Sequence, residues 1–181
     1  MITFHEWLIV EKFGAKHDFS CAMADFQKSD ADKIIQWSKK HIPDNVLHTE
    51  DGMGREDEIH VTALYGLHTS EIESVKKIID KFSAFELTLG EISKFDSHPD
   101  YDVIKIEIAG SKIHALNKSL RTMEHTNKFK EFIPHCTIAY VKKGKCDNLL
   151  KNKYFEDNKV LINSITFSPA KGKKTKIKLA S

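Results

Sequence analysis

The sequence lacks several features that would point to a specialised class of protein. Its charges nearly cancel, since 28 Lys and Arg residues stand against 26 Asp and Glu residues and the formal net charge is +2. A chain with so small a net charge has no general attraction for polyanions such as duplex DNA, and only local patches remain to be considered. Because no run approaches the roughly 18 apolar residues of a membrane span, we expect a soluble protein without a membrane partner.

Cysteine is scarce, and its spacing shows no pairing. Cys21, Cys136 and Cys146 are odd in number and form no CxxC motif. This pattern argues against a disulfide framework and a zinc knuckle, and it favours a reducing cytoplasm. His-x-His, HExxH and Cys-His clusters are also missing, so the sequence predicts neither a metal site nor another cofactor.

The length bounds the number of domains. With 181 residues, 40% of them hydrophobic, the chain can bury one proper core and is short for two. We therefore expect a monomer in which residues 19–181 form a single domain. Thr3 and Glu6 form a capping-box pattern and Gly14 is a plausible stop, which predicts an N-terminal helix within a lead-in at residues 1–18.

The order of predicted elements occurs twice. The first half has expected strands at residues 19–26, 59–65 and 85–95, with helices beginning near residues 29 and 70. After a turn at residues 96–100, the second half has expected strands at residues 101–108, 135–141 and 160–167, with helices starting at residues 111 and 147. A last strand at residues 173–179 should pair with its predecessor as a hairpin. The pattern predicts an α+β fold of two β-α-β-α-β lobes, about residues 19–96 and 97–181.

Two His-x-Thr motifs, His60-Val61-Thr62 and His135-Cys136-Thr137, occupy the middle strand of each predicted half. Residues i and i+2 of a strand point to one face, so each motif presents a His and a Thr side by side. If the halves pack about a pseudo-two-fold axis, the equivalent strands meet and both motifs share one central cleft.

This set of groups suits the cleavage of a phosphodiester. An unperturbed imidazole pKa of about 6.5 allows one His to be neutral and accept a proton while the other is protonated and donates one, which predicts a bell-shaped rate profile. Each Thr hydroxyl can donate a hydrogen bond to a non-bridging phosphate oxygen. The design requires no metal.

Residues 58–66 (EIHVTALYG) and 133–140 (IPHCTIAY) resemble the paired signatures of the 2H phosphoesterase superfamily, which includes 2′-5′ RNA ligase-like proteins and cyclic nucleotide phosphodiesterases. The resemblance implies a bilobal fold with antiparallel sheets around a cleft, His60 and His135 as acid and base, and Thr62 and Thr137 as phosphate binders. It leaves the substrate open between 2′,3′-cyclic phosphates and oligoribonucleotides. The compact, Lys-rich chain also resembles phage-encoded members, some of which degrade the cyclic oligonucleotide signals of bacterial antiviral defence; such a viral protein is expected in the host cytoplasm. A non-catalytic RNA-binding module is the remaining alternative.

Further residues are candidates for contacting the nucleotide or oligonucleotide. Tyr65 and Tyr140 could stack on a base, although each lies an odd number of residues from its His and should face the core of a regular strand. Around the turn between the halves, three aromatic side chains are placed for a cleft rim: Phe95, His98 and Tyr101. Lysines near the motif and the C-terminus could guide phosphates, or could simply protect a solvated strand edge: Lys142, Lys143, Lys145, Lys171, Lys173, Lys174, Lys176 and Lys178.

Overall fold

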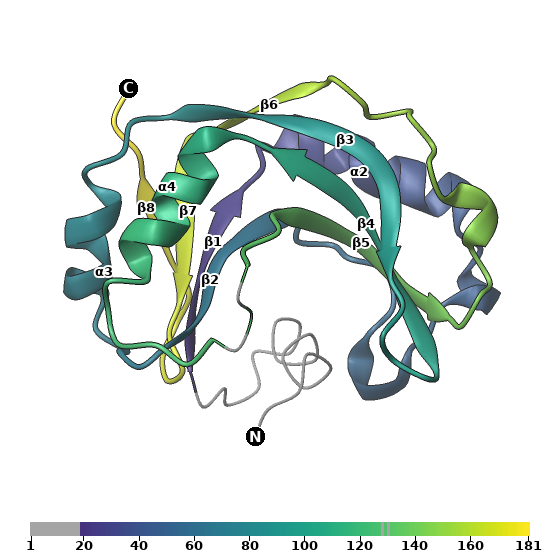
Figure 1. Cartoon of the computed structure of the whole chain (residues 1–181), viewed down its shortest axis with the longest axis horizontal. Helices are drawn as coiled ribbons and strands as arrows, with labels where there is room; N and C mark the ends of the chain where they lie inside the picture. The colour runs from purple at the N-terminus through teal and green to yellow at the C-terminus, as the bar shows by residue number, and fades with distance from the viewer. Residues whose placement is uncertain (1–18, 128, 130) are drawn as a thin grey trace.

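The computed structural model describes residues 19–127, 129 and 131–181, so the helix expected near residues 3–14 lies outside the described residues. Two antiparallel four-stranded sheets dominate the fold (Figure 1). The first sheet has the strand order β2-β1-β7-β8 and consists of β1 (Ser20–Asp25), β2 (His60–Leu67), β7 (Ser164–Ser168) and β8 (Thr175–Lys178). The second has the order β5-β4-β3-β6 and consists of β3 (Phe85–Phe95), β4 (Tyr101–Ala109), β5 (His135–Lys142) and β6 (Lys159–Ile162). The predicted α+β fold with antiparallel sheets is confirmed.

The two sheets correspond strand for strand. β2 and β5 each form one edge, and each pairs with the strand that begins its half of the chain, β1 or β4. Both edge strands begin with the His of a His-x-Thr motif. Because β2 and β5 also contact each other, the two motifs lie where the sheets adjoin.

The sheets do not divide where the sequence halves do. β3 precedes the expected boundary at residue 96 but belongs to the second sheet, whereas β7 and β8 close the first. The single strand expected at residues 160–167 is wrong, because the chain leaves the second sheet after Ile162 and enters the first at Ser164. At the crossing residue, Asn163, the backbone carbonyl accepts a hydrogen bond from Leu179 N at 2.9 Å.

Two of the α-helices also pack against the sheet to which the preceding strand does not belong. α2 (Lys28–His41) follows β1 yet packs on β5, while α4 (Ser111–Leu120) follows β4 yet packs on β2. α3 (Ile72–Ile79) lies next to α4 beside the first sheet (Figure 1). Three short 3-10 helices complete the described elements, at Asp44–Val46, Glu50–Gly52 and Asp147–Leu149.

The apolar side chains form two clusters. The larger joins residues of both sheets and of all three α-helices into one continuous core. The smaller gathers residues on the side of the sheets that carries the motifs: Cys21, Met23, Met53, Tyr65, Tyr101, Val103 and Tyr140, with Phe19 and Phe95 packed against them. The motif side of the molecule is therefore built on a largely aromatic floor.

Candidate active site

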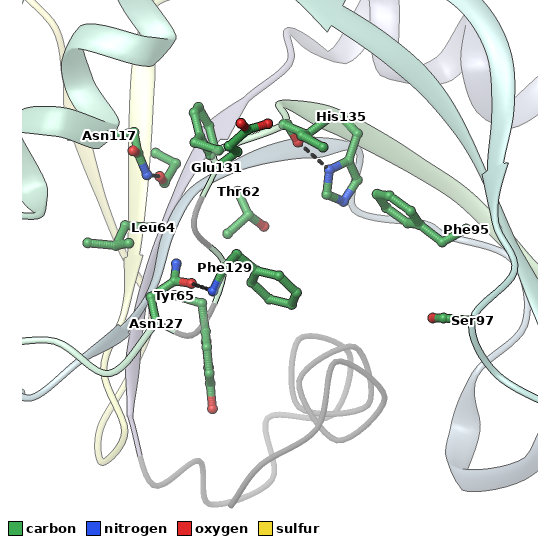
Figure 2. A pocket seen from close by; sticks show the side chains of 13 residues that line it. Thr62, Leu64, Tyr65, Phe95, Ser97, Asn117, Asn127, Phe129, Glu131 and His135 are labelled. Atoms are coloured by element: carbon green, nitrogen blue, oxygen red, sulfur yellow. Dashed lines mark hydrogen bonds between the residues drawn. The ribbon is translucent and has the colours of Figure 1, made fainter.

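The His and Thr of each motif alternate in exposure with their neighbours. His60 and Thr62 are partly exposed while Val61 is buried, and the same alternation holds for His135 to Thr137. Thr62 and His135 line one pocket of about 330 Å³, so this space is shared by the two motifs (Figure 2). We call it the aromatic pocket, because the rings of Tyr65, Phe95, Phe129 and Phe132 contribute to its wall.

The two histidines are held by matching hydrogen bonds. His60 Nδ1 lies 2.6 Å from the Glu58 carbonyl oxygen, and His135 Nδ1 lies 2.9 Å from the Ile133 carbonyl oxygen (Figure 2 shows the second). A carbonyl oxygen only accepts, so Nδ1 carries a hydrogen in both rings. Nε2 is then the nitrogen that gains or loses a proton in each ring, as the roles of acid and base require.

A bulge in each motif strand corrects the expectation that the two tyrosines face the core. In β2 the register shifts around Ala63, and in β5 it shifts around Ile138, so each strand holds one extra residue directly after its motif Thr. The extra residue reverses the alternation beyond it. Tyr65 therefore lies on the same face as Thr62, and Tyr140 on the same face as its own motif.

Phe95 and a buried lysine adjoin His135. The Phe95 ring meets the His135 ring edge-on with centroids 4.8 Å apart, and Lys105 Nζ lies 4.7 Å from the Phe95 centroid. Lys105 pairs in register with Thr137 and donates a hydrogen bond to Ser93 Oγ at 2.6 Å. Burial lowers the pKa of Lys105, and the nearby Glu107 carboxylate opposes this only in part. A cation with restricted hydration thus lies beside the second motif. In the first sheet, the residue that pairs with the motif threonine is Met23.

The other predicted contact residues lie deeper or further away. Tyr101 is only 1% exposed, because His98 stacks on its ring at 4.2 Å and His48 lies at 4.8 Å, so its expected place at the rim is wrong. Tyr140 is fully buried in the smaller cluster. Lys142 lies at the end of β5, where its Nζ donates to Asn45 O at 3.0 Å.

A second pocket, of about 400 Å³, lies beside His60 and has a different character. We call it the charged pocket, because carboxylates and lysines share its wall: Asp25, Asp57, Glu58, Lys174 and Lys176. Lys176 Nζ lies 3.5 Å from Asp25 Oδ2, and Lys174 forms an ion pair with Glu58. Two lysines of the C-terminal run are thus placed next to a motif histidine. Thr137 lines neither the charged nor the aromatic pocket.

Several pocket residues were not found from the sequence. The loop before β5 contributes Asn127, Phe129 and Glu131, and no pattern in the sequence marked them. Asn117 also lines the aromatic pocket, and it did carry a signal, since it interrupts the apolar stripe of α4. Lys105 was detectable in the same way, as a charge within the apolar strand β4.

Over the residues that the structure describes, no three His, Cys, Asp or Glu side chains are grouped as metal ligands would be. None of the helices in this part of the chain is long and apolar enough to cross a membrane.

Comparison with known proteins decides the family. Residues 37–168, more than half of the chain, match the 2′-5′ RNA ligase superfamily. The chain belongs to this superfamily. The resemblance of its two motif segments to the 2H phosphoesterases is thereby confirmed. A search among curated proteins found no match.

Solved structures show how the superfamily fold is shared. TT0787 of Thermus thermophilus is similar with a TM-score of 0.62 and 14% identity, over 89% of this chain and 97% of that chain. Kluyveromyces marxianus Usb1, solved with uridine monophosphate, has a TM-score of 0.61 and 8% identity, over 90% and 98% of the two chains. E. coli LigT, solved with 3′-AMP, has a TM-score of 0.57 and 14% identity, over 91% and 100%. At these identities the likeness establishes the bilobal fold.

Proposed function

We propose that this protein is a metal-independent phosphodiesterase that cleaves a nucleotide phosphodiester with an adjacent 2′-oxygen. Membership in the superfamily supports a hydrolase of this kind. The observation that carries the proposal is the matched pair of histidines, each holding its Nδ1 hydrogen on a backbone carbonyl at the junction of the two sheets. Neutral and protonated imidazoles in such a pair provide a base and an acid for one phosphorus atom.

The steps follow from the groups present. One Nε2 takes the proton of the attacking oxygen, which is either a water approaching a 2′,3′-cyclic phosphate or a ribose 2′-hydroxyl approaching its own 3′ linkage. A new P–O bond forms, the bond to the leaving oxygen breaks, and the Nε2–H of the other ring protonates that oxygen. Thr62 and Thr137 donate hydrogen bonds to non-bridging oxygens, which stabilises the charge gathered there in the transition state.

The two pockets support a nucleotide or oligonucleotide as substrate. Tyr65, Phe95 and Phe129 give the aromatic pocket ring faces and edges on which an unpaired base can stack. On the other side of the reacting phosphorus, the charged pocket offers carboxylates to ribose hydroxyls and lysines to a further phosphate. The likeness to proteins solved with 3′-AMP and uridine monophosphate agrees with this class of ligand.

The remaining predicted contact residues receive different roles in this proposal. Tyr101, Tyr140 and His98 support the floor under the substrate, since two of these rings are buried and the third covers one of them. Lys142, at the end of β5, would meet only a substrate long enough to extend past the motifs. We also propose that residues 19–181 form one domain, because the main core is continuous across both sheets, and that this domain acts as a monomer.

A substrate panel tests the function. The protein is incubated in EDTA with 2′,3′-cyclic mononucleotides, a short oligoribonucleotide, its all-deoxy counterpart and cyclic dinucleotides with 3′-5′ or 2′-5′ linkages, and products are identified by mass spectrometry. We expect cleavage of substrates with a 2′-oxygen next to the phosphorus and none of the deoxy strand. His60→Ala should bind without cleaving, whereas His41→Ala, a histidine stacked on Trp37, should cleave as the wild type does.

The same panel separates the alternatives. Cleavage confined to cyclic dinucleotides would favour a degrader of cyclic oligonucleotide signals over the broader activity. Binding of RNA without turnover of any substrate would contradict the proposed enzyme and support a non-catalytic RNA-binding module.

A further inference from the structure

At the bulge of each motif strand, the backbone carbonyl of the extra residue accepts a hydrogen bond from a group outside the four-stranded sheet, and the donor differs between the two strands. In β5 the Ile138 carbonyl accepts a hydrogen bond from the backbone N–H of Glu56 at 2.9 Å. In β2 the Ala63 carbonyl accepts one from the side chain of Asn117, with Nδ2 at 2.7 Å. The same irregularity is thus satisfied by the main chain in one half and by a side chain in the other.

Asn117 occupies a position that its helix would ordinarily give to an apolar residue. It is 5% exposed and lies on the buried stripe of α4 together with Ile113, Leu116 and Leu120. A buried amide is costly unless it is hydrogen-bonded, so its presence in the stripe is explained by the contact with Ala63. Ala63 itself is completely buried, so in the intact structure its carbonyl is hydrogen-bonded by Asn117 and not exposed to solvent.

We propose that Asn117 is a positioning residue that holds the β2 bulge and, through it, keeps Thr62 and Tyr65 on the same face of the strand. This inference rests on the proposed phosphodiesterase function. In a regular strand, a residue three positions after Thr62 would face the opposite side. The extra residue between them is what brings both side chains to the wall of the aromatic pocket.

The register between β1 and β2 shows which side chains would move if Asn117 were lost. With the bulge present, Met23 lies opposite Thr62 and Cys21 lies opposite Tyr65. If Ala63 enters the regular register, either Thr62 or Tyr65 moves to the core face, since a slip of one residue reverses every side chain beyond it. The phosphate-binding hydroxyl or the base-contacting ring is then lost from the pocket, while His135 and Thr137 in the other sheet keep their places.

Enzyme kinetics test this role against a merely structural one. Asn117→Ala is compared with Ile113→Ala, which removes a fully buried side chain from the same stripe without touching the bulge. Both are assayed on a 2′,3′-cyclic mononucleotide below their melting temperatures. We expect Asn117→Ala to lower kcat/KM by about 10- to 100-fold, as small misplacements of reacting groups do, with kcat falling and KM rising. Ile113→Ala should lose at least as much thermal stability while keeping kcat and KM near wild type.

A crystal structure of Asn117→Ala gives a readout that does not depend on activity. We expect the β1–β2 register to change so that Thr62 and Tyr65 no longer share a face. The proposal is overturned if the bulge persists unchanged, if Asn117→Ala keeps the wild-type kcat/KM, or if Ile113→Ala loses as much. Should the wild type cleave no phosphodiester, the proposed function fails, and the register in the variant still decides whether Asn117 holds the bulge.

Discussion

In the proposed mechanism, two threonine hydroxyls bind the phosphate on which the two histidines act. Thr62 lines the aromatic pocket, and Thr137 lies opposite Lys105 on the neighbouring strand. The two halves therefore present the same hydroxyl in different surroundings, one in an aromatic wall and one on a residue paired with a buried lysine. A phosphate held between them would have its non-bridging oxygens bound from both sheets.

Replacing either hydroxyl by a methyl group isolates its contribution. Thr62→Val and Thr137→Val keep the β-branched shape that suits a strand but remove the donor to phosphate. A hydrogen bond to a charged group contributes about 1.5–3 kcal/mol, so we expect each variant to lower kcat/KM about 10- to 100-fold. Steady-state kinetics on a 2′,3′-cyclic nucleotide measures this, with Thr49→Val as the control outside both pockets. Unchanged kinetics in both motif variants would remove the threonines from the mechanism.

At the residue scale, the sequence predicted the direction of a side chain wherever the strand is regular. The spacing of His60 and Thr62 predicted their common face, which the exposure pattern shows. The expectation that Tyr65 faces the core was wrong, because a one-residue bulge leaves no mark in the hydrophobic pattern. Asn117 explains that bulge, but its partner lies 54 residues away, beyond the reach of local reasoning.

At the scale of elements, a buried carboxylate joins β4 to the segments on either side of it. Asp102 accepts a hydrogen bond from Gly144 N at 2.8 Å, and Lys94 and Lys143 Nζ lie 3.1 and 3.0 Å from its oxygens. Burial alone would raise the pKa of Asp102, but the Gly144 N–H and the two ammonium groups together hold it below its ordinary value of 3.8. The cluster fixes the turn after β5 against the β3–β4 hairpin.

Asp102→Asn tests the contribution of this charged cluster through the pH dependence of the protein's stability. Because the folded-state pKa lies below the unfolded value, the carboxylate stabilises the protein above about pH 4, and this is lost as the pH falls through the folded pKa. Breaking a buried ion pair costs on the order of 3 kcal/mol, so we expect a clearly lower melting temperature at pH 7. Thermal unfolding from pH 7 to pH 3 should show the gap between variant and wild type shrinking with acid. A gap independent of pH would contradict the charge-based account.

The boundaries of several elements were predictable, but sheet membership was not. The expected strand at residues 85–95 matches β3, and the helix with Ile113 and Leu116 matches α4. Residues 160–167 were expected to form one strand, although the chain changes sheets at Asn163. Alternation of apolar residues indicates which face of a strand is buried. Because both sheets bury a face against the same core, this pattern does not show to which sheet a strand belongs.

For the whole molecule, the exchange of strands and helices between the halves explains how the site is assembled. α2 and α4 each cover the sheet that contains the other half's motif strand, and β3, β7 and β8 complete sheets begun elsewhere in the sequence. The two motifs, 75 residues apart by number (135 − 60), are brought together because β2 and β5 are equivalent edges of the two sheets. The internal repeat predicted this pseudo-symmetry, whereas the exchange required the structure.

The central claim is that His60 and His135 act together on one phosphorus atom. We expect His60→Ala and His135→Ala each to lower kcat by about 100- to 10,000-fold in EDTA, as removal of a general acid or base does. Because neither imidazole completes the reaction alone, the double variant should be no slower than the slower single variant. The measurement is the rate of 2′,3′-cyclic nucleotide hydrolysis by the wild type, both single variants and the double variant. A single variant that cleaves at the wild-type rate, or a double variant in which the two losses multiply, would contradict a shared reaction centre.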